Sequence, residues 1–178
     1  MFCCTPVIRP RCKWEVTKTI CYIWCLMKIS KIIASWFGIG YIKGGGTIAA
    51  VITCVILYVL QSHHLFEKNW VLPLAAFVVT LIGILTGNTV EAHWGKDSYR
   101  VVIDEVAGQM ITLLFVPLTA VNLIVGLILF RFFDILKPLG IRKMENLPAG
   151  TGVMMDDVLA GIYANLVLQI ILFVTERI

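Results

Sequence analysis

The chain has 178 residues, of which 59% are hydrophobic and 15% are charged, and its mean hydropathy is +0.89. A chain of this length and composition is too apolar to form a soluble domain, so the sequence predicts an integral membrane protein. The formal net charge is only +4, and we expect no nucleic-acid partner.

The first part of the chain is basic. Positive segments beside membrane helices stay in the cytoplasm, so we expect this end of the chain to lie there. We interpret residues 1–30 as a basic N-terminal extension of a membrane domain formed by residues 31–178, and residues 14–37 as an interfacial helix with Lys28, Lys31 and Ser35 on its wet face. Seven of the 15 Lys and Arg residues precede the first long apolar run: Arg9, Arg11, Lys13, Lys18, Lys28, Lys31 and Lys43.

Two apolar runs predict the first two membrane helices. The first extends from about Thr47 to Leu60, which is short for the roughly 20 residues that a span usually needs. The second extends from Val71 to Leu85. Together these two helices would return the chain to the side from which it started.

The third apolar region, from Val106 to Phe133, is too long for one span and short for two. Pro117 supplies a break, which favours a hairpin of two short helices over a single tilted span. The hairpin also keeps the basic residues on the cytoplasmic side. With a last helix from about Asp156 to Val174, the prediction is an all-α bundle of about five short transmembrane helices.

Five carboxylates lie at the borders of these apolar runs. Ionised side chains at a hydrocarbon boundary are costly unless they pair, bind a cation or face a wet cavity, so they predict a functional site. A site built only from carboxylate oxygens suits Mg²⁺ better than zinc. The predicted metal ligands are Asp104 and Glu105 in DEVAG, Asp134 in FRFFDILKP, and Asp156 and Asp157 in MMDDVLAG.

Small residues accompany these acids at helical spacing. Asp104 lies four residues before Gly108, and Asp157 lies four residues before Gly161, in a stripe that continues to Asn165. Small residues let membrane helices approach closely, so acids from different helices could reach one cation.

Basic residues next to the acids suit phosphate oxygens. Arg131 precedes Asp134, and Lys137 and Arg142 follow it. Arg and Lys both bind phosphate well. The glycines before Thr47, Gly45 and Gly46, could form an anion-binding helix start with Lys43 beside it, although a flexible turn explains them equally well.

Four stretches of the chain resemble the phosphatidylglycerophosphatase A family of bacterial membrane enzymes. The resemblance extends from about Trp36 to Asn165, and the glycine-rich step before Thr47 departs from the usual family pattern. It implies an Mg²⁺-dependent phosphatase of the bacterial inner membrane that removes the terminal phosphate of phosphatidylglycerophosphate, with its active site facing the cytoplasm. The stretches are WFGIGYIKGGGT, VIDEVAGQMIT, FRFFDILKPLGIR and GTGVMMDDVLAGIYAN.

In this interpretation a phospholipid is the partner, Asp104 or Asp157 is the general base, and Arg131 neutralises the phosphoryl group. Two alternatives remain open at this point. A CDP-alcohol phosphatidyltransferase also uses aspartates at membrane helix ends, but its Asp-Gly-x2-Ala-Arg run is absent here. A small ion-binding transporter would place its acids nearer the midplane. The sequence does not fix the oligomeric state.

Overall fold

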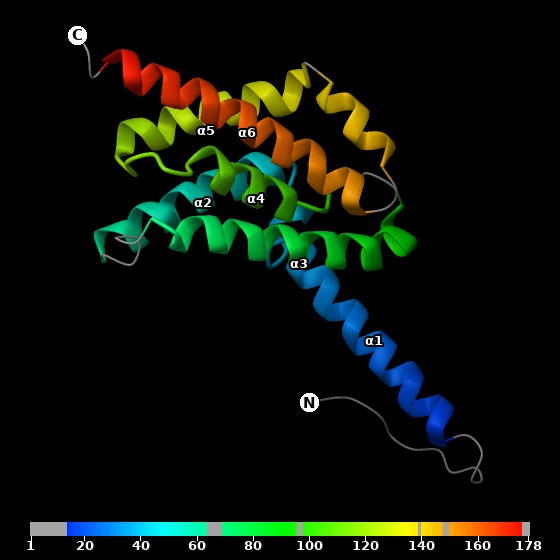
Figure 1. The fold of residues 1–178 in the computed structure, drawn as a ribbon. Helices are drawn as coiled ribbons and strands as arrows, with labels where there is room; N and C mark the ends of the chain where they lie inside the picture. The colour runs from blue at the N-terminus through cyan, green and yellow to red at the C-terminus, as the bar shows by residue number, and fades with distance from the viewer. Residues whose placement is uncertain (1–13, 64–68, 96–97, 139, 148–149, 176–178) are drawn as a thin grey trace.

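The computed structural model describes residues 14–63, 69–95, 98–138, 140–147 and 150–175. All regular elements in these ranges are helices, which confirms the all-α prediction (Figure 1). They are α1 (Trp14–Ala34), the 3-10 helix η1 (Ile39–Tyr41), α2 (Gly45–Ser62), α3 (Val71–Trp94), α4 (Ile103–Thr112), α5 (Ala120–Leu136), the 3-10 helix η2 (Ile141–Asn146) and α6 (Gly150–Thr175).

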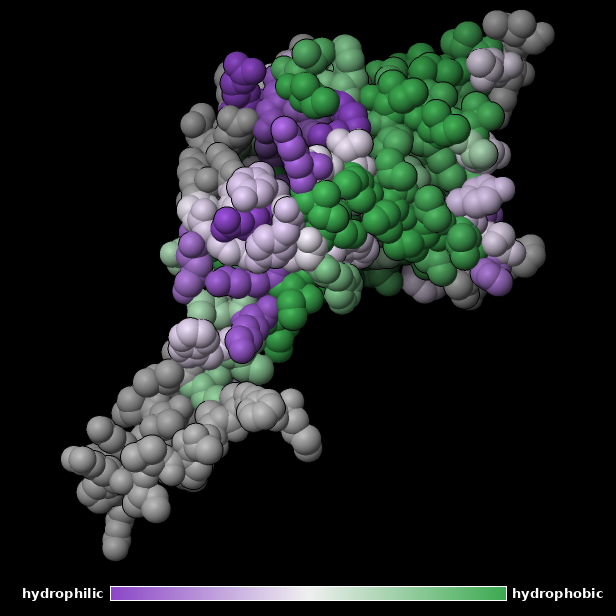
Figure 2. All heavy atoms as spheres, turned by 180° about the vertical axis from the view of Figure 1, so that it is seen from behind, coloured by the Kyte–Doolittle hydropathy of each residue, from purple (hydrophilic) through white to green (hydrophobic). Residues whose placement is uncertain are grey.

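Three of the described helices, α2, α3 and α6, are long and apolar enough to cross a membrane. Figure 2 shows an apolar belt over the bundle, with hydrophilic residues gathered at one end of it. The helices α4 and α5 have 10 and 17 residues, fewer than the roughly 20 of a usual span. The chain is therefore a helical membrane protein, and the number of five spans stays a prediction.

The region that could have been a hairpin or a single span is a hairpin. The helix α4 ends at Thr112 and α5 begins at Ala120, so the break surrounds Pro117 as predicted. The Thr119 hydroxyl caps α5 by accepting a hydrogen bond from the backbone N–H of Asn122 at 3.3 Å. Both helices pack against α6, and the hairpin brings the start of α4 beside the end of α5.

Two helices are longer than predicted. The helix α3 continues past Leu85 to Trp94 and stops only where Gly95 adopts a positive φ of 81°. The helix α6 begins at Gly150 instead of about Asp156. The reason is a tertiary contact, because the side-chain oxygen of Asn88 accepts a hydrogen bond from the Gly150 N–H at 2.8 Å.

The helix α1 leaves the bundle at an angle and contacts it through its C-terminal part, which packs on α3 (Figure 1). Lys28 is exposed as predicted, and Lys31 lies over the ring of Trp94 at 5.9 Å. The prediction for Ser35 is wrong, since it is only 1% exposed. Its hydroxyl is used locally, accepting from the Gly38 N–H at 3.1 Å. The interfacial position of α1 stays a prediction.

The short helix α4 forms the centre of the bundle. Eight of its ten residues are buried, and it packs against α2, α3, α5 and α6. An element buried on all sides holds its side chains in fixed positions, so α4 is a rigid support for the acids at its start.

Candidate active site

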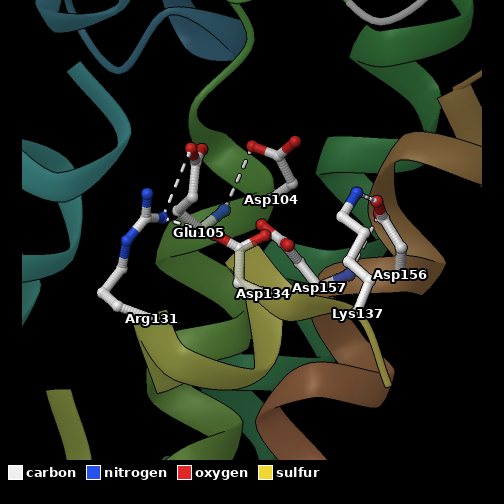
Figure 3. Close-up of polar contacts among 7 residues, drawn as sticks. All are labelled: Asp104, Glu105, Arg131, Asp134, Lys137, Asp156 and Asp157. Carbon is white, nitrogen blue, oxygen red and sulfur yellow. Dashed lines mark hydrogen bonds and ion pairs between the residues drawn. The ribbon is translucent and has the colours of Figure 1, made fainter. Parts of the chain in front are cut away.

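Three helices bring the five predicted acids to one end of the bundle. They come from the first turn of α4, the last turn of α5 and the second turn of α6, and Figure 3 shows them turned toward one another. They line a cavity of about 260 Å³ together with Lys137. The lining acids are Asp104, Glu105, Asp134, Asp156 and Asp157, and Ser98, Tyr99, Val101 and Val153 complete the wall.

Glycines bring α4 and α6 together. A Cβ atom on Gly161 would lie 2.5 Å from the carbonyl oxygen of Gly108, and a Cβ atom on Gly108 would lie 2.8 Å from that of Asp157. Only glycine permits this backbone approach, which the spacing of small residues predicted. One turn further along α6, the Asn165 amide donates to the carbonyls of Thr112 and Leu114 at 2.9 and 2.8 Å. These bonds satisfy the C-terminal end of α4 and fix the register of the two helices.

Three acids form the centre of the site. Oxygen atoms of Asp104, Glu105 and Asp157 all lie within 4.8 Å of one another. Asp104 and Asp157 are 7% and 4% exposed. Oxygen Oε2 of Glu105 is buried and has no hydrogen-bond partner among the described residues. Clustered buried carboxylates repel one another and lack solvation, so this arrangement requires protons or a cation, and the all-oxygen donor set fits a hard cation such as Mg²⁺.

The other two acids contact basic side chains. Nη1 of Arg131 lies 2.6 Å from Oδ2 of Asp134 and 3.9 Å from Oε1 of Glu105. Nζ of Lys137 lies 2.5 Å from Oδ2 of Asp156. Arg131 and Lys137 therefore stand on opposite sides of the three central acids, as Figure 3 shows.

The backbone explains how Lys137 reaches the cavity. The helix α5 ends at Leu136. Lys137 is the C-cap residue and adopts a left-handed conformation with φ 45°. This turn keeps its side chain on the side of Asp156, and a left-handed conformation in a non-glycine residue is uncommon enough to indicate a constraint from the site.

The start of α2, which we predicted as a possible phosphate-binding site, lies next to one of the acids. The first turn of α2 meets a carboxylate, because a Cβ atom on Gly46 would overlap Oε1 of Glu105. Gly45 is buried, whereas Lys43 and Thr47 are exposed and do not line the acidic cavity. The positive end of the α2 dipole thus lies next to Glu105.

Arg142 is exposed on η2 and also lies outside the wall of the acidic cavity. The sequence gave no sign of two other residues near the site. Gln109, one turn after Glu105 on α4, is fully buried, and neither of its amide atoms has a hydrogen-bond partner among the described residues. Tyr99, 70% exposed, stands at the cavity wall with its ring 5.3 Å from the Arg100 guanidinium.

The fold and the site define a helical membrane protein with a carboxylate cluster flanked by two basic side chains. Residues 32–172 match the phosphatidylglycerophosphatase A family. The chain belongs to this family, and it is a phosphatase of phospholipid metabolism. This membership favours hydrolysis over the transferase and transporter alternatives.

Curated relatives carry two different names. A protein of Bacteroides thetaiotaomicron named putative phosphatidylinositol-3-phosphatase is 39% identical over 147 residues, covering 78% of this chain and 91% of the relative. Phosphatidylglycerophosphatase A of Haemophilus influenzae is 37% identical and covers 76% of this chain and 84% of its own length. The Escherichia coli protein of the same name is 32% identical over 53% of this chain and 59% of its own length. No solved structure matches the chain.

Proposed function

We propose that the protein is an Mg²⁺-dependent hydrolase that removes the terminal phosphomonoester of phosphatidylglycerophosphate and releases phosphatidylglycerol. The observation that carries this proposal is the charge of the cavity. Five carboxylates face two basic side chains, so the fully ionised site would have a formal charge of about −3.

This charge makes a divalent cation necessary for the reaction. A phosphomonoester carries nearly two negative charges at neutral pH, and the ionised acids alone would repel it. Asp104, Glu105 and Asp157 are the residues that would hold the cation, since their oxygens converge and one of them is buried without a partner. When bound there, Mg²⁺ supplies charge neutralisation and the activation of water.

The chain's own residues divide the remaining tasks. Arg131 and Lys137, on opposite sides of the acids, bind the equatorial phosphoryl oxygens and orient the phosphorus for in-line attack. Asp104 or Asp157 accepts the proton of the attacking water. Asp134 is less available for this task because its carboxylate pairs with the Arg131 guanidinium. Asp156 holds the Lys137 ammonium in place.

The proposed orientation places this site in the cytoplasm, at the inner membrane of a bacterium. Lys31, Arg100 and Arg142 lie near the same end of the bundle as the acids, whereas the sequence between α2 and α3, between α4 and α5 and after α6 holds two basic residues, Lys68 and Arg177. The positive-inside rule then orients the bundle.

The test is phosphate release by the detergent-purified protein from phosphatidylglycerophosphate, phosphatidic acid and phosphatidylinositol 3-phosphate, each with Mg²⁺ and with EDTA. The third lipid is included because of the name of the Bacteroides relative. We expect release that requires Mg²⁺, favours phosphatidylglycerophosphate and is lost in Asp157→Asn. Glu91→Gln, on α3 outside the acidic cavity, is the matched control and should keep its activity.

Preference for another of the three lipids would correct the substrate and leave the reaction class intact. Undiminished release in EDTA would refute the role of the cation. No release from any of the three lipids would refute the proposed substrate class, when a thermal unfolding transition shows that the sample is folded.

A further inference from the structure

An apolar groove lies on the outer surface of the bundle between α2 and α5. It encloses about 250 Å³ and is separate from the acidic cavity, with which it shares no lining residue. Its wall is built from aliphatic side chains with one thiol, and a tyrosine stands at one end. The lining residues are Val51, Cys54, Val55, Tyr58, Ala120, Leu123, Ile124 and Leu127.

The α5 side of the groove is in line with the active site. Leu127, Ile124 and Ala120 lie four, seven and eleven residues before Arg131, so these positions share one face of the helix. Arg131 is the residue that pairs with Glu105 and Asp134. The apolar wall of α5 thus leads directly to the guanidinium at the acidic cluster.

The α2 side repeats this arrangement. Val51, Val55 and Tyr58 lie four, eight and eleven residues after Thr47, which is exposed in the first turn of the helix. The neighbouring Gly46 lies against the Glu105 carboxylate. One end of the groove therefore points along both helices toward Thr47 and Arg131, which lie one helical turn beyond its last lining residues.

The distance from the far end of the groove to Arg131 matches one leaflet of a bilayer. The eleven residues from Ala120 to Arg131 correspond to about 16 Å along a helix. Half of a typical hydrocarbon core is about 15 Å. An extended acyl chain whose head group reaches Arg131 would therefore occupy the groove along its length.

We propose that the groove between α2 and α5 binds an acyl chain of the phospholipid substrate and thereby guides the head group past Thr47 and Arg131 into the acidic cavity. This inference rests on the proposed function and adds the route by which the lipid is aligned. An acyl chain gains no hydrophobic energy by moving from lipid into the groove. The benefit is orientation, because a chain held along α5 positions its phosphate at the cation site.

The side chains of the groove favour a lipid over a second protein helix. Helices that pack in membranes use small residues at their contact. Here large side chains protrude, with Val55 57% and Ile124 59% exposed, and Ala120 is the small residue among those that line the groove. Branched side chains around a narrow apolar space fit a flexible hydrocarbon chain.

The first test fills the groove. Ile124→Trp and Val55→Trp would occupy it, and Ile170→Trp on the exposed face of α6 is the matched control, since Ile170 is 63% exposed and outside the groove. For long-chain phosphatidylglycerophosphate in mixed micelles we expect kcat/KM to fall about tenfold in both groove variants, equivalent to ~1.4 kcal/mol. For the dihexanoyl analogue we expect less than a twofold change. Groove variants that match the control on both substrates would overturn the proposal.

The second test does not need turnover. A photoreactive benzophenone side chain at position 124 should cross-link to a phospholipid in vesicles of anionic lipid, and Val55→Trp across the groove should reduce this product at least fivefold. A protein dimer cross-linked from position 124 would identify a second copy of the chain as the occupant and overturn the proposal. If the wild-type protein releases no phosphate but position 124 still cross-links to lipid, the proposed function fails and the lipid-binding groove stands. The failure of the function and the failure of the groove are therefore distinguishable.

Discussion

Gly161→Ala tests whether the close approach of α4 and α6 sets the geometry of the acids. The added Cβ atom would lie 2.5 Å from the Gly108 carbonyl oxygen and 3.2 Å from its carbonyl carbon. A carbon and a carbonyl oxygen in close contact are usually at least ~3.3 Å apart. Because the obstructing atoms belong to the backbone of α4, the two helices must separate by about 0.8 Å.

This displacement acts on the active site. Asp157 lies one turn before Gly161, and Asp104 lies one turn before Gly108, so separating the glycines moves the central acids apart. Misplacement of catalytic groups by about 1 Å can reduce a rate by roughly 100-fold. We expect kcat to fall by about this factor. Overpacking costs ~1–3 kcal/mol, but alanine favours the helix by ~1 kcal/mol, so the protein should still fold.

The assay is phosphate release in detergent with saturating Mg²⁺, together with thermal unfolding. Gly126→Ala is the matched control, because it is the same substitution at a buried helical glycine. Its Cβ atom would meet side-chain ends, namely Cδ2 of Leu113 at 3.0 Å and Cδ2 of Leu168 at 3.4 Å, which can shift. Activity within twofold of the wild type in Gly161→Ala, or an equal loss in Gly126→Ala, would refute the reasoning.

Three further substitutions probe the supports of the site. Asn165→Leu removes both hydrogen bonds to the end of α4 and should destabilise the protein by roughly 2 kcal/mol; an unchanged unfolding midpoint in detergent would contradict this role. Lys137→Met leaves Asp156 without the ammonium at 2.5 Å and should lower kcat/KM at least tenfold. Lys137→Arg should recover part of this loss. Equal activity in both variants would show that the positive charge is not required. Gly46→Ala places a Cβ atom on the Glu105 carboxylate and should raise the Mg²⁺ concentration needed for half-maximal activity several-fold. An unchanged Mg²⁺ titration would show that Glu105 can move without loss of Mg²⁺ affinity.

The sequence predicted the parts of the fold that depend on local signals. Pro117 breaks the third apolar region where expected, and the spacing of Asp157, Gly161 and Asn165 indicated a stripe facing the bundle interior, which the contacts of Gly161 and Asn165 confirm. These features are readable because proline excludes helix locally and because positions four residues apart always share a helix face.

Tertiary contacts explain what the sequence could not predict. The apolar pattern predicted a last helix from about Asp156, yet α6 begins at Gly150, whose N–H donates to Asn88, 62 residues earlier. The helical spacing of Ser35 from Lys28 and Lys31 predicted that it faces solvent. The helix ends at Ala34, however, and the turn that follows buries Ser35. The glycines before Thr47 suggested an anion site or a flexible turn, and phosphate binding there stays a prediction; the sequence did not indicate that Gly46 faces the Glu105 carboxylate. The contacts of Gly150 with Asn88 and of Gly46 with Glu105 join residues distant in sequence, which periodicity does not encode.

The length of the helices bears on the choice between a lipid and a soluble substrate. The 26 residues of α6 correspond to about 39 Å, roughly 9 Å more than a ~30 Å hydrocarbon core. If Thr175 lies at one border of the hydrocarbon core, about the first six residues of α6 extend beyond the other border. That second border then lies near Asp156. The same calculation for the 24 residues of α3, starting from Val71, places that border close to Glu91. The acids then lie at the depth where the lipid head groups begin, so a phospholipid can present its phosphomonoester to them without leaving the bilayer, and this position favours a lipid substrate independently of the charge of the cavity.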